Sequence, residues 1–250
     1  MADKIKIVRQ GGEEIQPALN KREDFILKYK NIIIGCIAAI VVIIVGIVFW
    51  NNHKKAQLEA AQTASSVPQM SLQTAMTALQ SGISDFGEQN YLAALNGDSA
   101  TKSMGFLKIA DEYSSTPAGN VANLYAGLCY AHMDKWEDAV KYLEKFDDAG
   151  DMLISPAALG ALGNAYAHVN KLDDAVKTLQ KAGEKANNIL LTPIYYVQAG
   201  EILESQGKKA EALELYKKVK QYERVSGVEG ISQSSLYVDL IDEYIERVSQ

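Results

Sequence analysis

The chain has 250 residues, a formal net charge of −6 and 8% aromatic residues. Residues 1–30 carry seven Lys and Arg against five Asp and Glu, whereas residues 51–250 carry eighteen against twenty-six, a net −8. Phosphate binding needs a basic face, so this acidic exterior argues against nucleic acid as a partner. The chain has two cysteines, and one of them, Cys36, lies in an apolar run, so we expect no disulfide within the chain. Few Pro and many Ala, Leu, Lys and Glu indicate an all-α fold.

A tail and a transmembrane segment are predicted first. Residues 1–30 form the tail, and the Gly pair and mixed charges of its first twenty residues are typical of disorder. The 19 residues from Ile32 to Trp50 carry no charge, and thirteen of them are Ile, Val or Phe. At about 1.5 Å per helical residue this run spans roughly 28 Å, close to the ~30 Å hydrocarbon core of a bilayer. We therefore predict a single transmembrane helix over residues 31–50.

The sequence Ile33-Ile34-Gly35-Cys36 has the form of a lipoprotein cleavage box, which raises the alternative of a cleaved signal. A cleaved signal places its apolar region before the cut, after a short basic start. Here the long apolar run follows Cys36, and thirty residues lie upstream of the run. This order favours an uncleaved signal anchor. A buried helix of a water-soluble core is the other alternative, but such a helix rarely lacks a polar residue for five turns.

The basic residues flanking the span predict its orientation. Cationic side chains gather on the cytoplasmic side of transmembrane helices. Four precede the span, Lys21, Arg22, Lys28 and Lys30, and two follow it, Lys54 and Lys55. We expect the N-terminus in the cytoplasm and the larger C-terminal part translocated across the membrane, to which one helix attaches it.

Two segments separate the predicted anchor from the repeats. Residues 51–67 are rich in Ala and Gln, and we expect a stalk or linker that continues the membrane helix, with disorder as the alternative. Residues 68–98 are predicted as an N-terminal helical segment of a solenoid, because apolar residues recur there with the period of a helix. These residues are Leu72, Met76, Leu79, Ile83 and Phe86.

Residues 99–225 contain a repeat with spacings of 36 and 37 residues. In each unit a Gly in a first helix is followed twelve residues later by an Ala near the start of a second helix. A small residue at a contact lets two helix axes approach, and a large residue four positions after the Ala fills the adjacent hole. The small pairs are Gly127/Ala139, Gly163/Ala175 and Gly200/Ala212, and the large residues are Leu143, Leu179 and Tyr216.

The ends of the array follow from the same register. Gly105, 34 residues before Ala139, marks the second helix of an earlier, degenerate repeat, so we count four helix pairs. Ser155 and Thr192 each precede a proline, and we predict that their hydroxyls cap the following helices. Residues 226–250 are expected to form a capping helix, because a solenoid must cover its last apolar face. Its apolar residues are Leu236, Leu240, Ile241, Tyr244 and Val248.

These offsets resemble the tetratricopeptide repeat, with two or three extra residues in the turns between repeats; a generic array of helical hairpins is the alternative. The resemblance implies a groove lined by the first helix of each repeat, which binds proteins. Such an apolar groove fits an extended segment or a partner helix, unless the chain's own terminal helices fill it. The candidate groove residues are Val121, Leu124, Leu128, His132, Asn164, His168, Ile194, Val197 and Glu201.

Neither a catalytic nor a cofactor site is predicted. The sequence has no Gly-rich phosphate loop, zinc-protease motif or nucleophile elbow. His132 and His168 occupy one repeat position twice, and two histidines do not complete a metal site. We therefore expect no enzymatic activity, no metal, no cofactor and no small-molecule substrate.

Several stretches resemble one branch of the tetratricopeptide proteins more closely, the YfgM-like proteins of Bacteroidota. The segments YLAALNGD, GFLKIADEYSSTPAGNVANLYAGLCYA, WEDAVKYLEKF and TPIYYVQAG carry this resemblance. It implies an inner-membrane protein, ancillary to the SecYEG translocon, that pairs with a PpiD-like chaperone and attends to unfolded exported clients. The function expected on this basis is a periplasmic scaffold or holdase. A structural adapter of an envelope assembly or secretion machine is the alternative.

Overall fold

The computed structural model describes residues 15–82, 84–99, 102–225 and 236–249, and it divides the chain into two units, Met1–Ala56 and Gln57–Gln250. Helix α1 (Ile15–Gln80) begins in the first unit and ends in the second. Residues 15–20, for which the composition suggested disorder, are helical. The rest of the predicted tail, residues 1–14, lies outside the described residues.

The first unit contains the predicted membrane segment. All twelve residues from Ala39 to Trp50 are helical and exposed, and large apolar side chains such as Val42 and Phe49 are more than 70% exposed. By length and composition, the described helix from Ala39 onward can cross a membrane, and its most apolar window is not buried. A helix in a water-soluble core would bury such a face.

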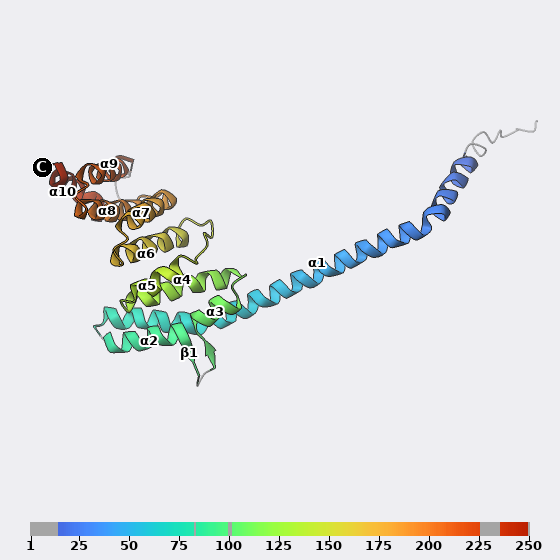
Figure 1. Ribbon diagram of the computed structural model, residues 1–250, viewed down its shortest axis with the longest axis horizontal. Coiled ribbons are helices and arrows are strands. Elements are labelled where there is room, and N and C mark those ends of the chain that lie inside the picture. The colour runs from blue at the N-terminus through green and yellow to red at the C-terminus, as the bar shows by residue number, and fades with distance from the viewer. Residues whose placement is uncertain (1–14, 83, 100–101, 226–235, 250) are drawn as a thin grey trace, which may run out of the picture. The chain divides into compact units, whose positions relative to one another are not determined.

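The second unit is a stack of antiparallel helices, as predicted (Figure 1). After the C-terminal part of α1 come a degenerate first helix pair and then three regular pairs. Each helix packs on its neighbours in the chain. Buried side chains form three successive clusters along the stack, because each pair covers its apolar face with the next. The helices are α2 (Ser84–Asn96), α3 (Phe106–Glu112), α4 (Pro117–His132), α5 (Trp136–Leu143), α6 (Ile154–His168), α7 (Leu172–Ala186), α8 (Thr192–Ser205), α9 (Lys209–Val225) and α10 (Leu236–Ser249).

The first pair differs from the prediction in two ways. The predicted helical segment over residues 68–98 is divided, because α1 ends at Gln80 and Gly82 takes a φ of +77° in the turn before α2. Between α2 and α3 lies a short antiparallel ladder of β1 (Gly97–Asp98) and β2 (Ser103–Met104), which the sequence did not predict.

The predicted apolar stripe is buried only in part. Leu72 is buried, but Met76 and Leu79 of α1 and Phe86 of α2 are exposed, and Ile83 lies outside the described residues. Small residues make most of the contact instead, since they let α1 approach the neighbouring helices closely. The buried positions on α1 are Ala61, Ser65, Pro68, Leu72, Ala75 and Ala78.

Glycine permits close helix contact within each regular pair. A Cβ added at Gly127 would lie 2.5 Å from Leu143 Cγ, and one added at Gly163 would lie 2.6 Å from Leu179 Cγ. In the last pair Gly200 meets the ring of Tyr216. The partner alanines Ala139, Ala175 and Ala212 are fully buried. Gly105 differs, since it precedes α3 and lies against the backbone of Leu95 and Gly97.

A left-handed residue turns the chain between the helices of each regular pair. Asp134, Asn170 and Gly207 occupy equivalent positions with φ of +55°, +59° and +74°. Asp, Asn and Gly are the residues that visit this region at least cost. In the last turn, Lys208 also forms an ion pair with Asp173 of the preceding pair, with 2.8 Å between Lys208 Nζ and Asp173 Oδ1.

The predicted caps of two helices are wrong. The hydroxyls of Ser155 and Thr192 lie inside the first turn and bond to preceding residues. Ser155 Oγ accepts from the Ala149 N–H, and Thr192 Oγ1 accepts from the Asn188 N–H of the loop and donates to Gly183 O of α7. The side chain four positions before each hydroxyl bonds to the backbone ahead of the helix instead. Asp151 Oδ1 accepts from the Leu153 N–H, and Asn188 Oδ1 accepts from the Leu191 N–H. A hydroxyl does cap α4, where Thr116 Oγ1 accepts from the Gly119 N–H at 3.1 Å.

Replacing Gly163 by Val tests the close contact. We expect Gly163→Val to lower the free energy of unfolding by about 1–3 kcal/mol, because the added atoms overlap the Leu179 side chain. The measurement is urea unfolding of the full chain in detergent, followed by circular dichroism. Ala157→Val, at an exposed position of the same helix, is the matched control. Equal stability of the two variants would contradict the assigned contact.

Replacing Asn170 tests the left-handed turn. We expect Asn170→Ala to lower the free energy of unfolding by about 1 kcal/mol, since a Cβ without a local polar group disfavours positive φ. Asn170→Gly should leave the stability unchanged or raise it slightly. The same unfolding experiment compares both variants, and an Ala variant as stable as the Gly variant would count against the strained turn.

Candidate protein-binding surface

The first helices of the pairs carry the nine predicted groove residues, and the structure buries several of them. Leu124 is 5% exposed and Val197 is fully buried, each inside a hydrophobic cluster. Leu128 is half-buried and packs against the same cluster as Leu124. These three side chains hold helices together, so they offer little surface to a ligand.

Two of the exposed candidates are histidines, and each stacks on an aromatic ring. His132 lies over Tyr91 with ring centroids 5.0 Å apart, and His168 lies over Trp136 at 3.6 Å with nearly parallel planes. Desolvation lowers the pKa of His132, which favours the neutral ring. Across the described residues, no group of three or more His, Cys, Asp or Glu is placed to hold a metal ion. The repeated histidine position therefore acts through ring stacking.

Helix α10 covers the acidic end of the predicted groove. Its Tyr244 hydroxyl donates to Glu201 Oε1 at 3.1 Å. Arg247 donates to both carboxylate oxygens of Glu204, at 3.0 and 2.7 Å, and Tyr216 donates to the same carboxylate. The Arg247 hydrogen bonds are the main cause that lowers the pKa of Glu204. Two apolar residues, Ile241 and Val248, anchor α10 in the last hydrophobic cluster.

Helix α1 lies against the other end. Val121 of α4 lines a hollow of about 370 Å³ together with Leu58, Gln62 and Gln69 of α1 and with Tyr125. The chain's own helices thus border the predicted groove at both ends, but Glu201 remains exposed and Val121 lines an open hollow. Between these ends lie His132, Asn164, His168 and Ile194, which are exposed or half-buried.

Cys129, the thiol outside the apolar run, is fully buried, and desolvation raises its pKa to about 12. A thiol with so raised a pKa is a poor nucleophile at neutral pH. It behaves as a small apolar residue of the cluster formed by α1 to α4.

The family of the chain follows from the repeat geometry and from comparison with known proteins. The sequence pattern described as a tetratricopeptide repeat-like domain matches residues 23–233. The chain belongs to this family. Tetratricopeptide repeat-like domains are typically non-enzymatic scaffolds for protein interactions, so the chain carries a protein-binding repeat domain. A comparison with curated proteins finds no match.

Two solved structures show the same fold at low sequence identity. Two crystal structures of a putative kinesin light chain of Podosopora anserina, with nearly identical TPR-like repeats, give TM-scores of 0.53. They are 13% and 14% identical to this chain, and the alignments cover 75% of this chain and 86% and 87% of theirs. A crystal structure of MamA protein gives a TM-score of 0.42 at 17% identity, covering 73% of this chain and 86% of that one.

Sequence reasoning missed the partners that close the surface. Tyr91 and Trp136 were not connected with the histidines, and Arg247 was not connected with Glu204. A signal existed for Trp136, since it precedes the repeat Ala139 by three residues and begins a helix. The Arg247 pair joins residues 43 apart in different helices, so only the packing of α10 on α8 brings it together.

The Glu204 contact predicts an acid-sensitive docking of α10. Because the folded pKa lies below the ordinary value of 4.5, this contact stabilises the fold above about pH 4.5 and is lost as pH falls through the lowered value. We expect the stability of Glu204→Gln to fall less than that of the wild type as the pH is lowered. At neutral pH we expect Glu204→Gln to lower the free energy of unfolding by about 1 kcal/mol, a modest loss because Arg247 is half-exposed.

The measurement is hydrogen exchange of residues 240–249 against pH, in the full chain in detergent. Glu246→Gln, which removes an exposed carboxylate of α10 itself, is the control. A Glu204→Gln profile that superimposes on the wild-type profile would show that the pair does not hold α10.

Proposed function

We propose that the chain is a single-pass membrane protein whose repeat domain works as a scaffold in the periplasm of a bacterium, beside the Sec translocon. The observation that carries the membrane part is the exposed apolar helix over residues 39–50, immediately ahead of a protein-binding repeat unit. Anchoring raises the concentration of the repeats near membrane partners, so that weak contacts become effective.

The periplasmic part of the proposal rests on sequence. Four basic residues precede the span and two follow it, which favours a cytoplasmic N-terminus. The resemblance to YfgM-like proteins supports SecYEG and a PpiD-like chaperone as partners and newly exported, unfolded proteins as clients. In this role the inner face would cover apolar segments transiently, as a holdase does.

A structural adapter of an envelope machine is the second candidate, and one observation favours it. The inner face is bordered by α10, which bonds to Glu201 and Glu204, and by α1 across the hollow at Val121, so the stretch between them is short. A short surface suits one defined partner segment better than many unrelated clients. Co-purification in mild detergent separates the two candidates: translocon and chaperone subunits support the first, and one stoichiometric envelope component supports the second.

Membrane topology is the first property to test. Because Cys129 is buried, the experiment needs an introduced thiol, such as Lys181→Cys at an exposed position of α7, combined with Cys129→Ala. In spheroplasts an impermeant maleimide should label this cysteine before lysis, whereas a cysteine at Gln10 should react only after lysis. The reverse pattern would place the repeats in the cytoplasm and refute the export role, while leaving a membrane-tethered binding domain.

A further inference from the structure

Two loops between helix pairs share a six-residue motif. Residues 151–156 read DMLISP and residues 188–193 read NILLTP, with the 37-residue spacing of the repeat. Asp151 Oδ1 accepts from Leu153 N–H at 2.8 Å, and Asn188 Oδ1 accepts from Leu190 N–H at 3.0 Å. The two loops therefore have the same local structure.

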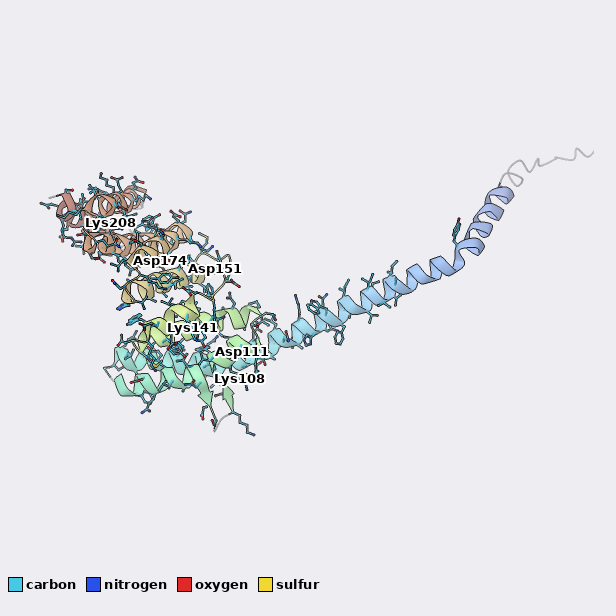
Figure 2. All side chains as sticks on the ribbon, in the orientation of Figure 1. Lys108, Asp111, Lys141, Asp151, Asp174 and Lys208 are labelled. Atoms are coloured by element: carbon cyan, nitrogen blue, oxygen red, sulfur yellow. The ribbon has the colours of Figure 1, made fainter. Side chains whose placement is uncertain are left out.

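The first loop is held in place at further points. Asn120 forms a pair of 2.7 Å hydrogen bonds with the backbone N–H and C=O of Asp147. Asp148 forms an ion pair with Lys185 of α7 at 2.5 Å. The backbone of this loop is thus fixed from two neighbouring helices, α4 and α7, before it enters α6. Figure 2 labels Asp151 on this loop.

Large apolar side chains point outward from these fixed loops. Met152 is 63% exposed, Leu153 66% and Leu190 51%, and Ile154 is exposed as well. We name Met152, Leu153, Ile154 and Leu190 the loop ridge. Contiguous exposed apolar side chains mark interaction sites in folded proteins. A rigid backbone beneath them lowers the entropy lost when a partner binds.

The geometry of the solenoid aligns the two parts of the ridge. Both loops join the second helix of one pair to the first helix of the next, so they lie at the same end of the antiparallel stack. Helices in contact lie about 8–10 Å apart, and one helix pair, α6 and α7, separates the two loops, so the loops lie within roughly 20 Å of each other. Residues on one face of a helix recur about every 10.5 Å, and an 18-residue helix is about 27 Å long. A helix laid across the loops can therefore place one apolar residue on each.

The charge beside the ridge indicates the partner's chemistry. Residues 147–154 contain three Asp and no Lys or Arg, and residues 186–193 contain no charge. Asp148 pairs with Lys185 and Asp151 accepts hydrogen bonds from its own loop, so the exposed Asp147 is the carboxylate offered to a partner. Residues 51–250 as a whole carry a net −8, which also favours a basic partner. We propose that the loop ridge is a docking site for a basic amphipathic helix of a partner protein. Its apolar face covers Leu153 and Leu190, and its Lys or Arg side chains lie beside Asp147. This surface is separate from the inner face, and its use depends neither on the export role nor on the side of the membrane.

The test uses the full chain in phosphatidylcholine nanodiscs and an 18-residue helical peptide of Leu and Lys that carries a benzophenone. We expect photo-cross-links to map to residues 147–156 and 187–193 by mass spectrometry. Leu153→Ser/Leu190→Ser should reduce their yield about tenfold or more, because it removes the apolar contact. Asp147→Asn should reduce it a few-fold and weaken its dependence on salt.

Met70→Ser/Met76→Ser, which alters two exposed methionines of α1, is the matched control and should leave the yield unchanged. Circular dichroism and unfolding midpoints verify that all variants fold. The proposal is overturned if Leu153→Ser/Leu190→Ser cross-links as well as the wild type, or if a Leu and Glu peptide cross-links equally.

Two further measurements identify other occupants, and either would overturn the proposal. Adding phosphatidylglycerol to the discs without peptide should not protect residues 152–154 from hydrogen exchange; protection would assign the ridge to lipid. Cross-linking between two copies of the chain should not depend on Leu153 and Leu190; its loss in the double variant would assign the ridge to self-association.

Discussion

Each regular helix pair depends on one close contact between a glycine and a large side chain. At Gly127 and Gly163 the space of a missing Cβ is taken by the leucine that comes sixteen residues later in the second helix. In the last pair Tyr216 takes that place against Gly200. Because close-packed interiors tolerate little extra volume, this contact sets the distance between the two helices. The positions of the turns, the loops and the outward-facing side chains follow from that distance.

The same packing decides which surfaces remain for a partner. The first helices of the pairs would line an open groove if the stack had no ends. Here α10 bonds to the carboxylates of Glu201 and Glu204, and α1 lies across a hollow from Val121. Helices that complete the apolar core of a solenoid also occupy its inner face. The accessible stretch is consequently shorter than the number of repeats suggests.

The loops between pairs have the opposite character. Their backbone N–H groups bond locally to Asp151, Asn188, Ser155 and Thr192, and Met152, Leu153 and Leu190 between them stay exposed. Leucine occurs at the same exposed position in two successive loops, Leu153 and Leu190. In a repeat protein such a position lies on a line along one edge of the stack. The edge and the inner face are therefore two different binding surfaces of one scaffold.

The sequence by itself determined the helical repeat, the apolar segment and the residues at the helix contacts. These features are local or periodic: nineteen residues without charge, and a Gly and an Ala twelve residues apart. Sequence reasoning misjudged the segment over residues 68–98, because the exposed Met76 and Phe86 follow a helical period as regularly as a buried stripe. It also misplaced the caps at Ser155 and Thr192, since a hydroxyl before proline suits either a cap or a bond to the preceding loop. Only the tertiary structure decided that Arg247 reaches Glu204, that His168 stacks on Trp136, and that Leu124 and Val197 are buried. These contacts depend on how whole helices pack against one another, and residue spacing along the chain does not specify that packing.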